Sequence, residues 1–180
     1  MNRYQIPYGK SQIGFYLPDG HLTDWIMPPE VQGVNNTEDA VINSLDNPIG
    51  EVNYENFCGA KSVAIAINDK TRPVPLTLLI PPLLEKLKSL RIKSTAISFY
   101  IATGTHTPVE PEKYPEFLPE FIYSAFPVLS HNCDQTSNLI NLGKTSYGTP
   151  VSVNKQFYNS DLKIVTGNIE PHHFMGFSGG

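Results

Sequence analysis

The chain has 180 residues, of which 40% are apolar and only 17% are charged. This length predicts one domain with a buried core, or one domain and a small appendage. The net charge is −4, from 13 basic and 17 acidic residues without a cluster of Lys and Arg, which argues against nucleic acid or an anionic membrane surface as the main partner.

The apolar segments of the sequence are short. No run approaches the roughly 18 apolar residues that a membrane span needs, and the N-terminal stretch MNRYQIPYGK lacks the apolar segment of a signal peptide. The two cysteines, Cys58 and Cys133, lie too far apart for a zinc motif or a Cys-x-x-Cys redox pair. We therefore expect a soluble, cytoplasmic protein with two reduced thiols.

The first part of the chain, residues 1–36, is predicted to be a hairpin followed by an irregular arm. Two alternating segments flank a turn at residues 8–10, and residues 20–36 are rich in Pro, Gly and Asn. A short helix then begins at residue 37, because Thr37 can cap it and acidic residues fill its first turn. The Asn47-Pro48 pair should end this helix.

The remainder, residues 37–180, alternates between strands and helices. Residues 62–68, SVAIAIN, read as a strand buried on both faces. Residues 76–90 read as a helix with a leucine stripe, with Pro81 and Pro82 in its first turn or kinking it. Further strands are predicted at four places, with a weak, proline-broken helical stretch between the first two: residues 94–102, 126–132, 149–160 (strand plus turn) and 161–168. This order predicts an α/β fold, a mostly parallel Rossmann-like sheet with helices on both faces.

Polar side chains follow three of these strands, at the edge of the sheet where α/β proteins bind ligands. Asp69 and Arg72 come after the first strand, in a loop stiffened by prolines, where an arginine can grip a carboxylate or phosphate. His106 follows the second strand, after Gly104, and is a candidate general acid or base. Two plainer interpretations stay open: an Asp69–Arg72 pair that only orders its loop, and a surface histidine.

The last predicted strand is followed by adjacent histidines and a glycine-rich run. Only one of His172 and His173 should face the crevice, since adjacent residues in an extended chain point to opposite sides. The run GFSGG, residues 176–180, could offer N–H groups to an anion, or it could be a simple turn. The other two histidines, His21 and His131, do not follow this pattern, and we interpret them as ordinary polar residues.

Four motifs together resemble a known family. LDNPIG (45–50), DKTRPVP (69–75), ATGTHTP (102–108) and EPHHFMGFSGG (170–180), in this order and spacing, resemble the N-terminal part of the nickel-dependent lactate racemase family. The resemblance implies a nickel-pincer nucleotide that takes a hydride from the carbinol carbon of a 2-hydroxy acid and returns it to the other face. It also implies that His106 and His172 exchange the hydroxyl proton and that Arg72 holds the substrate carboxylate.

For the cofactor, the resemblance implies a set of contact residues at the same loops: Asp69, Thr71, Gly176, Ser178, Gly179 and Gly180. The lysine that carries the cofactor, the histidine that ligates nickel, and the second domain that closes over the substrate come later in the family and are not in this chain. We therefore expect the 180 residues to be the N-terminal part of a racemase or epimerase, incomplete at its C-terminal end and inactive alone. His173 stands where an apolar aromatic residue is common in the family.

Two other functions remain open from the sequence. One is a binding domain for a nucleotide or organic anion without catalysis, which the missing lysine favours. The other is a metal-assisted hydrolase that uses His106, His172 and His173, although two adjacent histidines make a poor metal pair.

Overall fold

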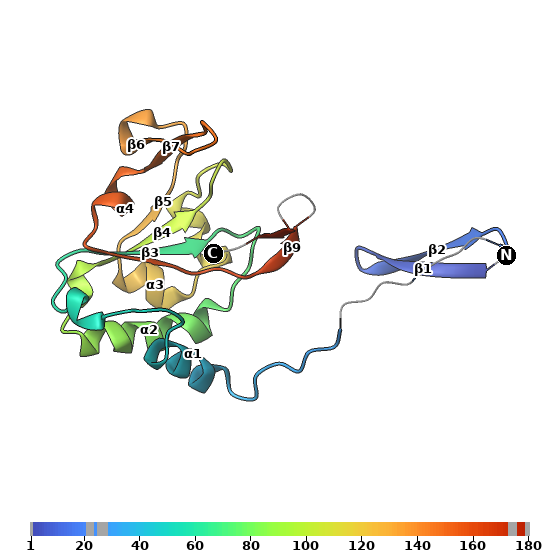
Figure 1. The fold of residues 1–180 in the computed structure, drawn as a ribbon, viewed down its shortest axis with the longest axis horizontal. Coiled ribbons are helices and arrows are strands. Elements are labelled where there is room, and N and C mark those ends of the chain that lie inside the picture. Colours follow the sequence, from blue (N-terminus) through green and yellow to red (C-terminus); the bar gives the residue numbers. More distant parts are fainter. Residues whose placement is uncertain (1, 21–23, 25–28, 173–175, 179–180) are drawn as a thin grey trace. The chain divides into compact units, whose positions relative to one another are not determined.

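The computed structural model describes residues 2–20, 24, 29–172 and 176–178. The chain forms two compact units, Met1–Gly33 and Val34–Gly180 (Figure 1). No helix among these described residues combines the length and apolar character needed to cross a membrane. Cys58 and Cys133 are free thiols, as predicted.

The first unit is the predicted hairpin. Strand β1 (Asn2–Tyr8) pairs in antiparallel fashion with β2 (Ser11–Leu17). Gly9, with a φ of 58°, supplies the left-handed backbone of the turn, and the Ser11 hydroxyl donates to the Tyr8 carbonyl at 3.0 Å. The rings of Tyr4 and Phe15, which lie opposite each other, stack with centroids 5.7 Å apart.

The second unit is built on a four-stranded parallel sheet, which confirms the predicted α/β fold. Its order is β5-β4-β3-β8. The strands are β3 (Val63–Asn68), β4 (Ile97–Ala102), β5 (Val128–Ser130) and β8 (Leu162–Val165). The central strands β3 and β4 are the two long apolar runs of the sequence, because strands covered on both faces need apolar residues on both.

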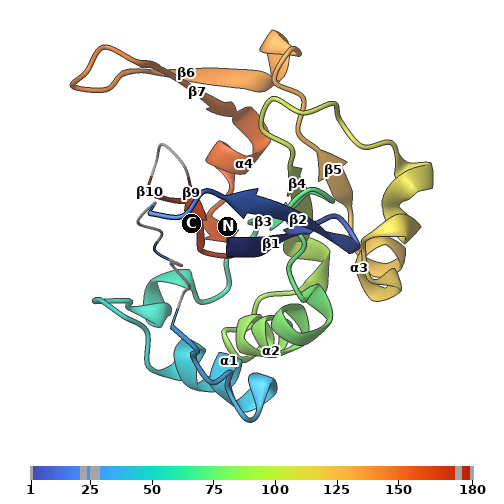
Figure 2. The ribbon, with the colours of Figure 1, turned by 90° about the vertical axis from the view of Figure 1, so that its right-hand side faces the viewer.

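Helices cover the sheet on both faces (Figure 2). On one face, α2 (Leu76–Ser89) and α3 (Glu120–Ala125) pack against alternate residues of β3 and β4, and α1 (Thr37–Asp46) packs on α2. On the other face lies α4 (Lys155–Asn159), where the ring of Phe157 meets that of Tyr100 edge-on at 5.8 Å. The core thus lies between α2, α3 and the sheet.

The cap of α1 differs from the prediction. Asn36, not Thr37, caps the helix: its Oδ1 accepts from the backbone N–H groups of Glu38 and Asp39 at 3.1 and 3.3 Å. Both residue types can cap a helix, so the sequence alone does not separate them. The end of α1 at Asn47 agrees with the prediction.

The two prolines of α2 lie in its interior, beyond the first turn, so the predicted placement in the first turn is wrong. Neither has an N–H group, so the carbonyls of Thr77 and Leu78, four residues earlier, receive no intrahelical bond from them.

We expect Pro81→Ala, at an exposed position, to raise the free energy of unfolding, by up to about 3 kcal/mol. Urea unfolding measures this change; an unchanged or lower stability would contradict the expectation.

Three features were not predicted. The strand predicted as buried at residues 161–168 is the edge strand β8, whose Lys163 and Val165 are exposed because that part of the second face is open. The chain also forms an antiparallel hairpin: β7 (Pro150–Asn154) confirms the strand predicted within residues 149–160, whereas its partner β6 (Leu139–Lys144) and the pairing were not predicted. A second small hairpin pairs β9 (Glu170–His172) with β10 (Gly176–Ser178). Short 3₁₀ helices occupy Tyr54–Phe57, Ser94–Ala96, Pro111–Glu116 and Thr136–Asn138.

Candidate functional site

The loops after three neighbouring strands meet around one pocket of about 210 Å³. The described residues that line it come from the end of β3, the end of β4 and the segment after β8: Asn68, Asp69, Thr71, Arg72, Ala102, His106, Thr166 and Gly167. Parallel strands bring their carboxyl ends to one edge, so residues far apart in sequence converge there. The predicted grouping of Asp69, Thr71, Arg72 and His106 is therefore present in the structure.

Asp69 is the buried centre of this group, with a side chain only 7% exposed. Its Oδ1 accepts from both the backbone N–H and the hydroxyl of Thr71, at 2.9 and 2.6 Å. The N–H of Arg72 donates to the Asp69 carbonyl at 3.2 Å. These bonds fix the first turn after β3 and hold the carboxylate in one orientation.

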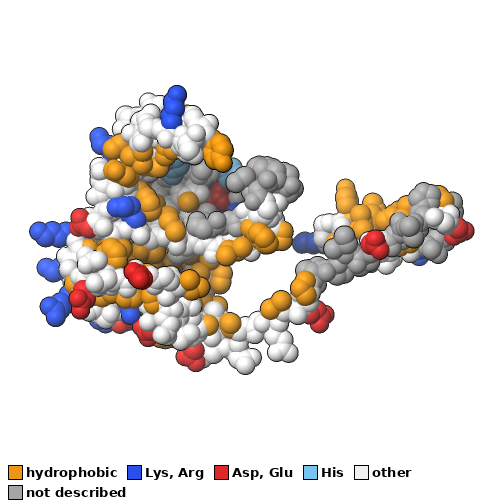
Figure 3. Space-filling model, viewed as in Figure 1, with side chains coloured by type: hydrophobic (Ala, Val, Ile, Leu, Met, Phe, Trp, Pro, Cys, Tyr) orange, Lys and Arg blue, Asp and Glu red, His pale blue; other side chains and the backbone are white. Residues whose placement is uncertain are grey.

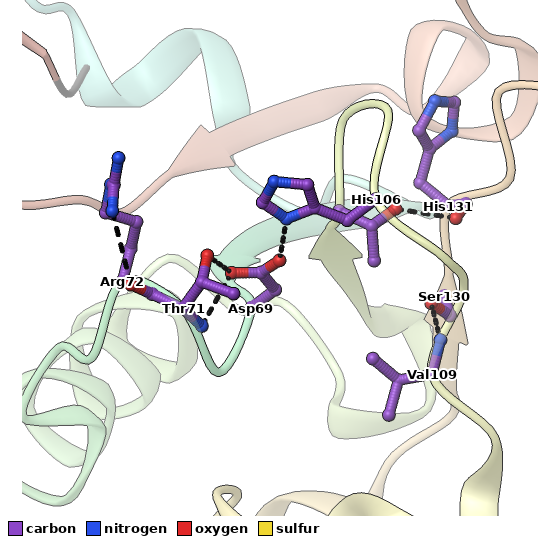
Figure 4. A network of polar contacts seen from close by, with 8 residues as sticks. Asp69, Thr71, Arg72, His106, Val109, Ser130 and His131 are labelled. Carbon is purple, nitrogen blue, oxygen red and sulfur yellow. Dashed lines mark hydrogen bonds and ion pairs between the residues drawn. The ribbon is translucent and has the colours of Figure 1, made fainter.

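His106 takes the other carboxylate oxygen. Its Nδ1 lies 2.6 Å from Asp69 Oδ2 (Figure 4). An ionised carboxylate can only accept, so in this pairing Nδ1 carries the hydrogen and the neutral ring keeps its lone pair on Nε2. The imidazole is 58% exposed at the pocket, so Nε2 is available to a ligand.

The loop that carries His106 is anchored at both sides. Gly104, with a φ of 59°, makes the turn, and the His106 N–H donates to the Thr103 carbonyl at 2.9 Å. Thr103 is itself buried, and its hydroxyl donates to the His131 carbonyl at 2.7 Å. The histidine is therefore held by backbone and side-chain bonds together.

The electrostatics of Asp69 favour its charged form. Burial alone would raise its pKa, but the hydrogen bonds from His106 and Thr71 outweigh burial, so the pKa of Asp69 lies below its ordinary value of 3.8. A carboxyl whose pKa is lower in the folded state stabilises the fold above the unfolded pKa. That stabilisation is lost as the pH falls through the folded pKa.

We expect Asp69→Asn to lower the free energy of unfolding at pH 7 by about 1–3 kcal/mol, since it disturbs a buried hydrogen-bonded group. The difference in unfolding free energy between variant and native chain should narrow as the pH falls below 3.8 and through the lower pKa of the folded state, where the native carboxyl also becomes neutral. Urea unfolding over a pH series measures it. Glu116→Gln, the same change of charge at an exposed site, serves as the control, and a gap independent of pH would contradict the assignment.

Arg72 lies at the open side of the pocket. Its side chain is exposed, and its Nη1 donates to the Thr71 carbonyl at 3.4 Å. The carboxylate of Asp69 is engaged by Thr71 and His106, so the predicted alternative of an Asp69–Arg72 ion pair does not describe this loop. The guanidinium points away from Asp69 in Figure 4 and can meet an anion from solvent.

The C-terminal candidates occupy the β9–β10 hairpin. His172 is half-buried on β9, opposite Gly176, and is not among the described residues that line the pocket. Gly176 has a φ of 81°, with open space where a Cβ would stand, and Ser178 ends β10. His173, Gly179 and Gly180 lie outside the described residues, as does His21. Within the described part of the chain, no three His, Cys, Asp or Glu side chains are grouped to hold a metal.

Two residues that line the pocket or bond next to it, Asn68 and Thr166, are not among the candidates from the sequence. Asn68 reaches the segment after β8, with Nδ2 3.4 Å from Asn168 Oδ1. The hydroxyl of Thr166 donates to the Ala66 carbonyl at 3.1 Å. Both are polar residues at or just after the end of a strand, and this position in the sequence is the feature by which they could be predicted.

Comparison with known proteins identifies the family. The sequence model of the lactate racemase N-terminal domain matches residues 8–180. The chain belongs to this family. Two curated lactate racemases are similar to it: that of Thermoanaerobacterium thermosaccharolyticum, 32% identical over 100% of the chain, and that of Lactiplantibacillus plantarum, 32% identical over 97%. The chain spans 43% and 42% of their lengths.

Solved structures agree with this lactate racemase-like fold. The lactate racemase apoprotein of Thermoanaerobacterium thermosaccharolyticum superposes with a TM-score of 0.78 at 31% identity, covering 98% of this chain and 41% of that one. A Thermotoga maritima protein, with a TM-score of 0.60 at 21% identity over 84% of this chain and 38% of that one, shares the fold.

Proposed function

We propose that the pocket at the strand ends binds the carboxylate and the hydroxyl of a 2-hydroxy acid, and that this chain is the N-terminal part of a 2-hydroxyacid racemase or epimerase. The observation that carries the proposal is the Asp69–His106 pair at 2.6 Å, in one pocket with Arg72. Membership of the lactate racemase N-terminal domain family supports the reaction class. Because the chain spans less than half of those enzymes, the activity of the whole protein belongs to the proposal.

Arg72 is proposed to bind the substrate carboxylate. A guanidinium presents two parallel N–H groups that match the two oxygens of a carboxylate, and this grip fixes the carbon next to it. The exposed position of Arg72, at the end of a loop locked by Asp69 and Thr71, suits this task. The reacting carbon would then lie toward His106.

His106 is proposed to move the hydroxyl proton at Nε2. When Nε2 accepts a proton the ring becomes positively charged, and the ionised Asp69 at Nδ1 stabilises that charge. Asp69 thus acts as a positioning residue: it sets the tautomer and orientation of the base. The hydroxyl lies on a different side of the site in each enantiomer, so racemisation needs a second group that takes and returns the hydroxyl proton. We propose His172 for this role, although it lies on β9 and not among the described residues that line the pocket.

The cofactor that the family resemblance implies, a nickel-pincer nucleotide, would supply the hydride acceptor for the reacting carbon. The residues present fit a nucleotide at this edge: Thr71 lines the pocket, and the backbone of Gly176 is open to close approach. We propose that Thr71, Gly176, Ser178, Gly179 and Gly180 contact it. Asp69 has both oxygens engaged by protein groups, so its contribution to the cofactor site would pass through Thr71 and His106.

The proposal is tested on the native gene product that contains this sequence. Purified with its cofactor, it should interconvert the enantiomers of at least one 2-hydroxy acid in a panel read by chiral chromatography. Tight nucleotide or anion binding by calorimetry without any interconversion would instead support a non-catalytic binding domain.

A further inference from the structure

A second pocket, of about 350 Å³, lies beside the first. Its walls are mostly apolar, with few polar groups: Ala66, Tyr100, Ile101, Ala102, Gly104, His131, Ser152, Val153, Asn154, Phe157 and Val165. It occupies the face of the sheet opposite α2, between α4 and the end of β7. Pockets of about 300–1,000 Å³ with apolar walls and a few polar groups are typical ligand sites.

The two pockets adjoin. Ala102 lines both, and Val165 of the apolar pocket is followed directly by Thr166 of the polar one. Gly104 and His106 belong to the same loop but line different pockets. Figure 3 shows histidine side chains in a hollow beneath the β6–β7 hairpin, among apolar side chains and beside an acidic one.

His131 is the unusual group of the apolar pocket. Its backbone is fixed, since its N–H donates to the Ile101 carbonyl at 3.1 Å and its carbonyl accepts from Thr103. Its Nδ1 is buried and has no hydrogen-bond partner within the described part of the chain. A buried polar atom without a partner is uncommon in folded proteins, because it has lost its water without replacement. Such an atom is satisfied by a water or by a ligand group, and His131 is one of the residues that line the apolar pocket.

We propose that the apolar pocket receives the side chain of the 2-hydroxy acid, and that His131 recognises a hydroxyl at the far end of that side chain. The inference rests on the proposed function, because Arg72 and His106 must hold the carboxylate and the reacting carbon at the polar end. The substrate class is then a 2-hydroxy acid with a ring or a branched chain that carries a hydroxyl, and not one with a methyl side chain.

The chemistry of the two pockets matches the two ends of such a molecule. The edge-on rings of Tyr100 and Phe157 form a wall against which an aromatic or branched side chain can pack. Nδ1 itself is buried, so the proposal requires the imidazole to turn and bring this nitrogen into the pocket. A hydroxyl can donate or accept, so it then satisfies Nδ1 in either tautomer. A methyl group would leave both the apolar walls and the nitrogen of His131 without a partner.

The test uses the native gene product that contains this sequence, labelled for NMR and titrated with lactate, phenyllactate and para-hydroxyphenyllactate. Each added methylene in an apolar pocket is worth about 10–200-fold, so phenyllactate should bind at least ~10-fold more tightly than lactate. The para-hydroxyl compound should bind more tightly still. Signals of Tyr100 and His131 should shift together with those of Arg72 and His106.

Variants separate the two ends of the site. Ala66→Leu fills the apolar pocket and should abolish the preference for phenyllactate, whereas Lys163→Leu, outside the pocket lining on an exposed position of β8, should not. If Ala66→Leu does not fold, Val165→Phe takes its place: this position is 58% exposed, so the larger side chain should fill the pocket from its open side and have the same effect. His131→Leu should remove only the advantage of the para-hydroxyl, and His131→Gln should restore part of it.

Three outcomes would overturn the inference. Binding of lactate and phenyllactate that is equally tight and depends on Arg72 would agree with the proposed function, but it would contradict the proposal that the apolar pocket receives the side chain. Phenyllactate binding that is unchanged in Arg72→Gln would show an independent apolar site. Absence of any Arg72-dependent binding of the three acids would count against the inference and against the proposed function together.

Discussion

His106→Gln should lower the rate of racemisation by the native gene product by about 10²–10⁴-fold, the range that a positioned general acid or base contributes. Glutamine keeps a polar side chain of similar reach but cannot take a proton at neutral pH. The Asp69 carboxylate, 2.6 Å from Nδ1 in the native chain, could still accept a hydrogen bond from the amide. The lower rate would therefore be due to the missing proton transfer and not to a change in the structure of the loop.

The kinetic constants distinguish the role of His106 from that of Arg72. In His106→Gln the loss should fall on kcat with little change in KM, because the carboxylate grip remains. In Arg72→Gln, KM should rise as well. Thr105→Ala, an exposed neighbour on the same loop, should stay close to the native rate. A His106→Gln variant that retains more than about a tenth of the native rate would exclude His106 as the acid/base.

The sheet and the position of the site could be predicted from the sequence. The central strands are long, continuous apolar runs, and such runs, separated by a leucine-striped helix, allow few other arrangements. Parallel strands must end at one edge, so Asp69, Arg72 and His106 could be placed together from the order of the strands alone. The convergence that the pocket shows follows from topology, not from any one motif.

The pairing within the site could not be predicted in the same way. Asp69 and Arg72 are three residues apart and of opposite charge, which suggested an ion pair, yet Asp69 binds His106, 37 residues away in sequence. The choice depends on the turn fixed by Thr71, whose bonds to Oδ1 leave Oδ2 facing His106. Side-chain directions of this kind depend on tertiary geometry, which a sequence pattern does not contain.

The unpredicted hairpins have a related cause. The strands β9 and β10 have three residues each, and the β6 sequence LINLGK does not alternate between apolar and polar residues. Alternation of apolar and polar residues is weak over such lengths. From the sequence, His131 is interpreted as an ordinary polar residue because it does not share the pattern of polar residues that follow the strands. Its interest comes from the burial of one ring atom, which only the packed structure shows.

Phe99→Ala should lower the free energy of unfolding of the 180-residue chain by about 3–5 kcal/mol. Phe99 is fully buried on β4 at the centre of the core, opposite Ile65 of β3 and Val128 of β5. Its ring meets that of Phe126 edge-on at 5.3 Å. Removing it opens a cavity that neighbours on three strands cannot fill, and the loss is a large part of the roughly 5–15 kcal/mol that holds a domain folded.

Urea unfolding of native and variant chains measures the effect, and Phe177→Ala provides the matched control, since Phe177 is 68% exposed on β10 and should cost little. If Phe99→Ala does not fold, Phe99→Leu should give a smaller loss that can still be measured. A change in the packing of β4 should also disturb the site, because the loop that follows β4 carries His106. In Phe99→Ala the NMR signals of His106 should broaden or shift, whereas in Phe177→Ala they should not. A variant that loses less than about 1 kcal/mol would contradict a core centred on β4 and, with it, the idea that this strand fixes the base in place.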